Sequence, residues 1–420
     1  MGIALILIYF VDLYIRPQDW VSLTLNWPMD WIVFSILLFF VPLKVSRLPT
    51  VLKSHLLWML VLWLAVVALS NLVHFDTATA SDRFVYYAKL VVVFFSLLLY
   101  LETDFDVRGV VWLQILLSAI LAIQCMDQVR TGIGWAGQPL GWDDGFGGRA
   151  KWVGLWDGMG VLSLLFVVAF PFLIQFFLGA WGIGYKAISL VLMGILFEGI
   201  ALTQSRGGYI ALVIVVILSI MFRFRAKKAV IPLAMAVVCL MTFAPARAGE
   251  LDDSNGSKSA SHRIELWSAG LTMVKENPVF GVGKSQFSHY AGEIAGLHLM
   301  AHNTFIENAA ETGLVGLWVY VGLVYLVAKG AHEVLRKAAS PRQASMARAM
   351  LVSIYGYVAA SMFVSTDFDL FYVQLGVVAA FCQSAGCSPK LTKRDAVRIA
   401  AICVTFIVTM YVYTALHFGG

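Results

Sequence analysis

Long apolar runs follow one another along almost the whole chain, and they constrain its fold more than any other feature. A helix needs about 20 apolar residues to cross the roughly 30 Å hydrocarbon core of a bilayer. Twelve runs approach that length, at 31–45, 55–73, 84–101, 109–126, 159–178, 187–203, 208–222, 229–244, 314–328, 349–366, 369–386 and 396–415. Met1–Ile15 is also apolar but is short and contains Asp12, so a thirteenth span stays open. The sequence therefore predicts an all-α polytopic membrane protein with about 12 transmembrane helices.

The composition supports the same class. Hydrophobic residues make up 60% of the chain and charged residues 13%, whereas about a quarter of an ordinary soluble domain is charged. Because further apolar runs follow the first, we expect the N-terminus to be retained rather than removed as a signal peptide. The five cysteines lie in or beside apolar runs and lack the spacing of a zinc site, so we expect neither a metal nor another cofactor.

The distribution of lysine and arginine predicts the orientation. If the spans alternate in direction, most basic turns fall on one side: Lys44, Arg47, Lys53, Arg108, Lys186, 223–228, 329–348 and 390–398. The positive-inside rule makes that side the cytoplasm and places the segments 127–158, 203–208 and 245–313 on the opposite, outward face of the membrane. This asymmetry accounts for the net charge of +5 without a nucleic-acid partner.

A long polar segment divides the chain into three parts. We expect an N-terminal transmembrane bundle of about nine spans at 1–244, a large outward-facing loop at 245–313, and C-terminal transmembrane helices at 314–420. The loop has no part in crossing the bilayer, so we look for the chemistry there. The tryptophan-rich segment 127–158 fits an interfacial belt better than a sugar-binding platform.

Three helices are predicted within the loop. The first begins after Ser261 as its N-cap and ends at Asn277–Pro278, and the second covers Phe287–Ala295, with a glycine turn between them. A third opens at His302 and runs towards the next span. Arg263 and His302 would then both lie near helix starts, where backbone amides favour anions.

The string Thr203–Tyr209 is one candidate binding element, because it joins two predicted spans. Arg206 at this border could simply reach the membrane interface, which is the default explanation. Gly207 and Gly208 follow it, and residues without side chains let a ligand approach the start of a helix. We therefore interpret Arg206 as a phosphate-binding arginine, since a guanidinium can hold phosphate oxygens through two hydrogen bonds.

His302 is the candidate general base. An imidazole has an ordinary pKa of about 6.5, so it can take a proton from a sugar hydroxyl near neutral pH. Asn303 and Glu307 are four residues apart on one helix face and could support the site. Asp367 could orient the base or merely cap a turn.

The loop offers further candidates. His262 and His298 stay open as alternative bases. Gly281–Ser285 suggests a phosphate-binding loop, but Pro278 stands where that pattern needs a glycine and no strand is predicted before it. Lys284 is kept as a secondary contact to a diphosphate or a sugar.

In this order, the motifs resemble the O-antigen ligase and polymerase superfamily of bacterial envelope enzymes, and the ligases in particular. The resemblance rests on Arg206 in TQSRGG, Arg263 in SHRIELW, His302 in AHNTFIENAAETG, and the Pro-x-x-Gly-x-Gly turn from Pro278 to Gly283. It implies a membrane-embedded glycosyltransferase fold of the GT-C type and an undecaprenyl-diphosphate-linked glycan as the donor substrate.

The implied reaction is an inverting, metal-independent transfer of the O-antigen glycan to lipid A-core among the membrane lipids, with the large loop in the periplasm and the spans in the bacterial inner membrane. Arg206 and Arg263 would neutralise the departing diphosphate, since the large loop has no Asp-x-Asp pair for a divalent ion, and His302 would deprotonate the acceptor. A repeat-unit polymerase and a protein O-oligosaccharyltransferase stay open as alternatives. The span count, the acid Glu198 within a span and the basic net charge would also suit a flippase, but no second copy of TQSRGG or of the loop is found.

Overall fold

The structure is a computed structural model that describes residues 2–25, 27–141, 148–224 and 254–418. These residues form helices and connecting segments, with isolated β-bridges and no strand among them. The predicted span 229–244 and the first residues of the large loop lie outside the described residues. The α-helices are α1 (Gly2–Ile15), α2 (Met29–Phe39), α3 (Leu48–Leu52), α4 (His55–Leu72), α5 (Thr77–Tyr100), α6 (Asp104–Thr131), α7 (Met159–Leu178), α8 (Ile183–Thr203), α9 (Arg206–Phe224), α11 (Ser254–Glu276), α12 (Phe287–Ala295), α13 (Thr304–Lys337), α14 (Pro341–Ser361), α15 (Asp369–Ser384) and α16 (Lys393–Phe418).

Eight helices in the described part of the chain are long and apolar enough to cross a membrane. They are α4 to α9, α13 and α16. A ninth is reached if α2 and the helical segment after it count as one span, although the two are bent by 51°. Pro42, which lacks a backbone N–H, explains why the predicted run 31–45 is not one straight helix. The polytopic membrane class is therefore supported, and the count of about twelve stays a prediction.

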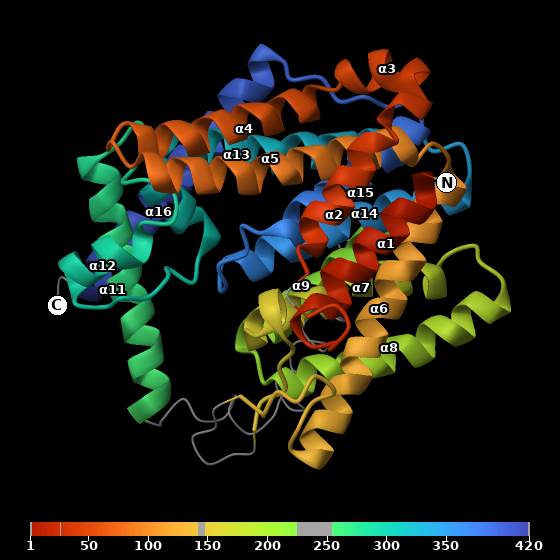
Figure 1. The fold of residues 1–420 in the computed structure, drawn as a ribbon, viewed down its shortest axis with the longest axis horizontal. Coiled ribbons are helices and arrows are strands. Elements are labelled where there is room, and N and C mark those ends of the chain that lie inside the picture. The colour runs from red at the N-terminus through yellow and green to blue at the C-terminus, as the bar shows by residue number, and fades with distance from the viewer. Residues whose placement is uncertain (1, 26, 142–147, 225–253, 419–420) are drawn as a thin grey trace.

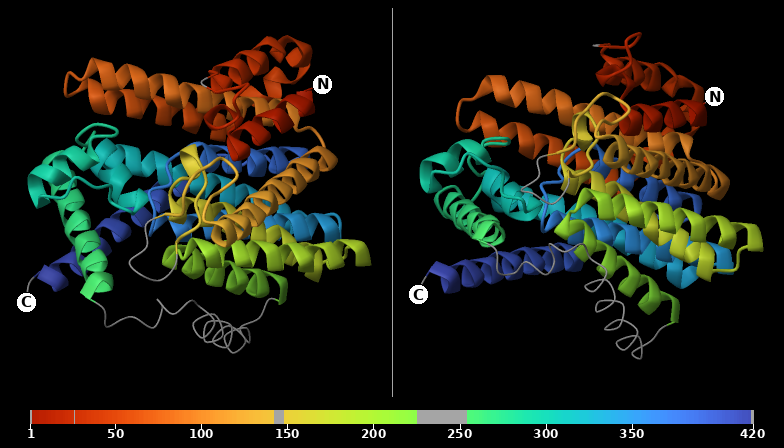
Figure 2. Two further views of the ribbon diagram at one scale, coloured as in Figure 1. Left: turned by 60° about the horizontal axis from the view of Figure 1, so that its bottom comes forward. Right: turned by 90° about the horizontal axis from the view of Figure 1, so that it is seen from below.

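The bundle is built around α7, which packs against α6, α8, α9 and α14 (Figure 1). Within its most apolar window 83% of the residues are buried, against 17% for α16 at the periphery. A second group pairs α4 with α5 and joins them to α13 and α15. The helices α11 and α12 lie at one end of the molecule beside α16 (Figure 2).

Buried polar side chains hydrogen-bond to one another across the bundle. Gln374 on α15 accepts from Gln114 on α6 at 3.1 Å and donates to Ser353 on α14 at 2.8 Å. Arg348 on α14 donates to Gln175 on α7 at 3.1 Å. Such partners are required because an unpaired polar group is costly away from water, so these contacts fix which helices are neighbours.

The connections at one end of the spans contact each other, as expected for one side of a membrane. His74, after α4, lies 2.8 Å from the carbonyl oxygen of Gly281, and Ala150 donates to the carbonyl of Leu202 at 3.0 Å. Trp152 and Trp156 are buried there, and the Trp156 indole N–H donates to the carbonyl of Leu13. These two tryptophans therefore do not form the predicted interfacial belt.

The helices of the large loop lie close to their predicted places, with one error. α12 and the end of α11 agree with the sequence, but α11 begins at Ser254 and not after Ser261, so Arg263 lies within the helix rather than at its start. α13 begins at Thr304 and continues into the bundle through a kink at Gly313, where φ is 67°.

Candidate active site

The Arg206 turn joins α8 to α9. Gln204 has a left-handed backbone with φ 50°, and the Ser205 hydroxyl caps α9 by accepting from the Gly208 N–H at 3.2 Å. These features place Arg206, which is exposed, at the first position of α9.

The glycines after Arg206 allow close packing of protein rather than the approach of a ligand. A Cβ on Gly207 would lie 2.9 Å from Cβ of Phe363, and one on Gly208 would lie 2.5 Å from Oγ of Ser163. The expectation that they open the helix start to a substrate is therefore wrong. They instead bring the Arg206 turn against α7 and against the connection between α14 and α15, which we call the 362–368 connection.

Arg263 is presented by α11, one helical turn before Trp267. The Trp267 indole N–H donates to the carbonyl oxygen of Ala301 at 2.9 Å. Residues four apart share a helix face, so Arg263 lies on the face of α11 that meets the segment before α13. Trp267 is the last residue of the string SHRIELW that carries Arg263, but its contact with Ala301, 34 residues further along the chain, could not be read from that string.

His302 is fixed between two anchored neighbours. Ala301 accepts the hydrogen bond from Trp267, and Asn303 is the N-cap of α13, where its Oδ1 accepts from the N–H groups of Phe305 at 3.1 Å and Ile306 at 3.2 Å. His302 itself is half-buried and has a left-handed backbone with φ 50°. Such a conformation is uncommon outside glycine and recurs at functional sites. Asn303 thus supports His302 through the backbone.

Arg263 lies within electrostatic range of both His302 and Arg206. Burial lowers the pKa of His302, and the positive charge of Arg263 lowers it further. Burial also lowers the pKa of Arg263, followed by repulsion from Arg206. Arg206 on α9 and Arg263 on α11 therefore form one positively charged region beside a histidine that is neutral at neutral pH.

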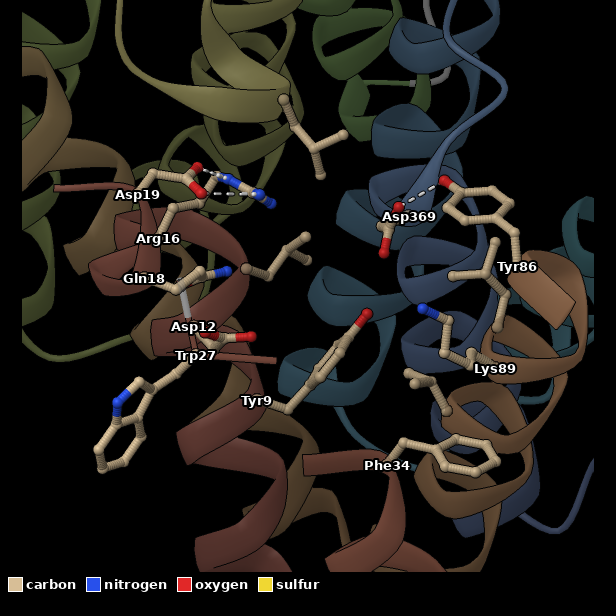
Figure 3. A pocket seen from close by; sticks show the side chains of 14 residues that line it. Tyr9, Asp12, Arg16, Gln18, Asp19, Trp27, Phe34, Tyr86, Lys89 and Asp369 are labelled. Atoms are coloured by element: carbon tan, nitrogen blue, oxygen red, sulfur yellow. Dashed lines mark hydrogen bonds and ion pairs between the residues drawn. The ribbon is translucent and has the colours of Figure 1, made fainter. Parts of the chain in front are cut away.

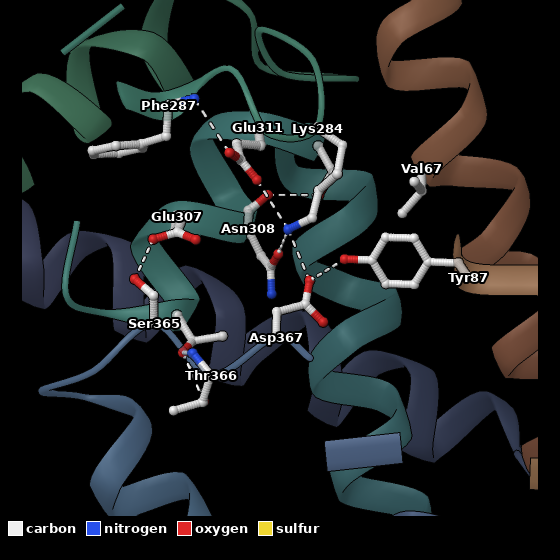
Figure 4. A network of polar contacts seen from close by, with 12 residues as sticks. Val67, Tyr87, Lys284, Phe287, Glu307, Asn308, Glu311, Ser365, Thr366 and Asp367 are labelled. Carbon is white, nitrogen blue, oxygen red and sulfur yellow. Dashed lines mark hydrogen bonds and ion pairs between the residues drawn. The ribbon is translucent and has the colours of Figure 1, made fainter. Parts of the chain in front are cut away.

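Lys284 is not available to a diphosphate. Its ammonium group is buried and contacts Oε2 of Glu311 at 2.9 Å, Oδ2 of Asp367 at 2.8 Å and Oδ1 of Asn308 at 2.6 Å (Figure 4). An ammonium has three donors, and all three have partners. The predicted contact between Lys284 and the diphosphate is therefore not supported.

We call this group, with Glu307 and Tyr87, the Lys284 cluster. Tyr87 on α5 donates to Oδ2 of Asp367 at 2.8 Å, and Glu307 accepts from Ser365. Burial alone would lower the pKa of Lys284, but Asp367 and Glu311 outweigh it and raise the pKa. Asp367 and Glu307 thus belong to the Lys284 cluster, and neither makes a described hydrogen bond to His302.

The glycine turn before Lys284 docks directly on the kink in α13. The N–H of Val282 donates to the carbonyl of Ala310 at 2.9 Å, that of Gly283 to Glu311 at 3.0 Å, and that of Leu314 to Pro278 at 2.8 Å. A Cβ on Gly281, where φ is 69°, would lie 2.3 Å from the carbonyl carbon of Glu311. The Pro-x-x-Gly-x-Gly pattern is thus explained by contact between two backbones.

Gly281→Ala is therefore expected to destabilise the protein by roughly 1–3 kcal/mol more than Gly296→Ala. Both glycines have a positive φ, but a Cβ on Gly296 would meet nothing within 4 Å. Thermal unfolding of the two variants in the same detergent measures the difference. Equal melting temperatures would contradict the docking of the turn on α13.

The 362–368 connection joins these parts, and the sequence indicated only its Asp367. Phe363 packs on Gly207. The Thr304 hydroxyl donates to the carbonyl of Val364 at 2.9 Å and accepts from the N–H of Thr366 at 2.8 Å. Through these contacts the Arg206 turn and the start of α13 are held against one segment.

Glu198 is exposed on α8 rather than buried within the bundle. It therefore does not line an interior proton path in the described structure, which removes one argument for a flippase.

Comparison with known proteins agrees with the resemblance inferred from the motifs. Residues 188–321, which include Arg206, Arg263 and His302, match the O-antigen ligase family. The chain is 26% identical over 171 residues to an uncharacterized protein of Haemophilus influenzae, a match that covers 34% of this chain and 41% of that protein. It is 38% identical over 68 residues to the exopolysaccharide production protein ExoQ of Rhizobium meliloti, covering 13% of this chain and 15% of that one. The matches span less than half of either relative, and they support the resemblance to the O-antigen ligase and polymerase superfamily.

Proposed function

We propose that this chain, with its O-antigen ligase family region at 188–321, is an inverting, metal-independent glycosyltransferase. It transfers an undecaprenyl-diphosphate-linked O-antigen glycan to lipid A-core at the periplasmic face of the inner membrane. The observation that carries this proposal is the grouping of Arg206, Arg263 and a neutral His302 at one end of the spans.

His302 acts as the general base. It removes the proton of an acceptor hydroxyl, the hydroxyl oxygen attacks the anomeric carbon, and the bond from that carbon to the diphosphate oxygen breaks. The electron pair leaves with the lipid diphosphate, and attack opposite the leaving group inverts the anomeric configuration. Burial and Arg263 both favour the neutral imidazole, which is the form that can accept the proton.

Arg206 and Arg263 stabilise the charge that develops on the departing diphosphate. Because guanidinium groups hold phosphate oxygens through paired hydrogen bonds, Arg206→Lys keeps the charge but loses that geometry. We expect Arg206→Lys and Arg263→Gln each to reduce transfer by roughly ten- to a thousandfold, measured as kcat/KM for the donor.

Arg263→Gln should also shift the pH dependence of transfer. Arg263 lowers the pKa of His302, so removing its charge raises that pKa, and the neutral base is then lost at a higher pH. The acidic limb of the rate profile should move upward in Arg263→Gln and stay in place in Arg130→Gln. The control arginine is exposed and pairs with Asp127. An unmoved limb would show that Arg263 does not act on the base.

A reconstituted assay tests the reaction itself. Purified protein in liposomes is given a lipid-linked glycan and lipid A-core, with and without a metal chelator. We expect transfer to survive chelation, because the two arginines take the place of a divalent cation. Strict dependence on added magnesium would contradict the proposal.

The similarity to ExoQ favours a second candidate, a repeat-unit polymerase of an exopolysaccharide type. The same assay separates the candidate reactions when lipid A-core, a lipid-linked repeat unit and a serine-rich peptide are each offered as the acceptor. Extension of the lipid-linked repeat alone would establish the polymerase, and transfer to the peptide alone would establish a protein O-oligosaccharyltransferase.

A further inference from the structure

A cavity of about 440 Å³ lies between α1, α2, α5 and the start of α15 (Figure 3). This volume is within the range of small-molecule sites, about 300–1,000 Å³. Its polar lining includes Asp12, Arg16, Gln18, Asp19, Lys89 and Asp369. The reaction proposed above uses none of these residues, and all of them lie outside the region matched by the family.

The wall formed by Arg16 and Asp19 is held in place by the neighbouring loop. Arg16 forms an ion pair with Asp19 and has a left-handed backbone with φ 52°. Gly154 lies so close that a Cβ on it would be 2.0 Å from Nε of Arg16 and 2.3 Å from Oδ2 of Asp19. The cavity is therefore bounded by a packed surface.

The charges of the cavity do not suit a phosphate. Arg16 is engaged by Asp19, and the Lys89 ammonium lies 5.0 Å from the centre of the Trp31 ring. Asp369 accepts from the Tyr86 hydroxyl at 2.5 Å, and both Arg16 and Lys89 are close enough to attract it. Three carboxylates face two cations, so a phosphate or diphosphate would be repelled.

Hydroxyl groups do suit this lining, because each can donate to a carboxylate and accept from a cation. Oε1 of Gln18 is buried and accepts no hydrogen bond within the described residues. A ligand donor in the cavity would satisfy it. The ring of Tyr9 points into the cavity and offers an apolar face to a sugar ring (Figure 3).

The cavity is connected to the candidate active site through two adjacent residue pairs. Tyr86 and Asp369 contact each other at the cavity, and Tyr87 and Asp367 contact each other in the Lys284 cluster. Asp367 lies in the 362–368 connection and Asp369 follows it. The same connection contains Phe363, which packs on the Arg206 turn. A sugar bound here would lie on the same side of the protein as the reacting groups.

We propose that this cavity binds an uncharged, hydroxyl-rich stretch of a substrate glycan. Its place in the reaction rests on the proposed function, but sugar binding itself does not. Both the donor and the acceptor carry such a stretch, and the experiment below separates them.

The test measures binding to the full chain in lipid nanodiscs, without a sugar-based detergent. The probe is a lipid-free, dephosphorylated oligosaccharide prepared from lipopolysaccharide, titrated by calorimetry. Gln18→Ala and Asp12→Asn are each expected to raise its Kd by about tenfold. His302→Ala and the control Asp157→Asn, an exposed acid paired with Lys151, should leave the Kd unchanged.

An unchanged Kd in both cavity variants, with melting temperatures like that of the parent, would overturn the proposal. The proposal would also be overturned if the cavity variants lost co-purifying phosphatidylethanolamine but kept the Kd for the oligosaccharide, since the cavity would then hold a lipid headgroup. In the transfer assay, a higher KM for the lipid-linked glycan assigns the cavity to the donor, and a higher KM for lipid A-core assigns it to the acceptor. If neither KM rose, the assignment of the cavity to a substrate would be overturned.

Loss of transfer in His302→Ala with intact sugar binding is expected. Intact transfer in that variant would count against the proposed function alone.

Discussion

Replacing His302 by alanine is expected to abolish glycan transfer while leaving the protein folded. A general base contributes about a hundredfold to ten-thousandfold to a rate, and here the burial of the imidazole and the charge of Arg263 both favour its neutral form. The side chain makes no described hydrogen bond, and the anchoring of this segment depends on Trp267 and Asn303 instead. The measurement is transfer from a purified lipid-linked glycan, alongside thermal unfolding in detergent.

The other histidines of the loop provide matched controls. His262 and His298 are both exposed, so His262→Ala and His298→Ala should retain most of the activity. If either control lost transfer while His302→Ala retained it, the base would be misassigned. In the wild type, the rate should fall with acid below the ordinary imidazole pKa of about 6.5, since the pKa of His302 is lowered.

The sequence predicted the helices of the bundle well because span length and apolar composition depend on local residues. Every predicted run within the described residues lies largely in a helix. The bend after Phe39 shows where that reasoning ends. The run 31–45 is apolar apart from Ser35 and Lys44, but Pro42 interrupts its backbone hydrogen bonding, so composition alone predicted one straight span where the structure has two helical pieces.

The residues of the candidate site were identifiable, but their partners were not. Arg206, Arg263 and His302 each stand at a recognisable break or motif in the sequence. The contacts that hold them come from segments distant along the chain, such as Phe363 against Gly207 and Trp267 on Ala301. Spacing within one helix cannot report such contacts.

Lys284 shows the same limit most clearly. A lysine after two glycines in a polar loop indicates phosphate contact when its neighbours in sequence are all that is known. In the fold, its partners come from α13 and from the 362–368 connection, and they use every donor of the ammonium. Lys284 was therefore recognisable as a functional charge, but its partners are two carboxylates and an amide of the protein and not a diphosphate.

Lys284→Met is consequently expected to destabilise the protein more than any other single change considered. It leaves Glu311 and Asp367 buried without their cation, and removal of one partner from a buried ion pair costs about 3–5 kcal/mol. Thermal unfolding in detergent should show a clearly lower midpoint and a lower yield of folded protein. Lys337→Met is the control, because that lysine is exposed and its pairing with Glu333 lies at the surface, so little change is expected.

Neutralising the acids as well separates the two explanations of Lys284. In the triple variant Lys284→Met, Glu311→Gln, Asp367→Asn no unpaired buried charge remains among these three, so part of the lost stability should return. A diphosphate-binding lysine would behave differently: its single variant would keep the wild-type melting temperature and raise the KM for the lipid-linked donor. Because the cluster joins the glycine turn, α13 and the 362–368 connection, its loss should instead reduce kcat by loosening the segment that carries His302.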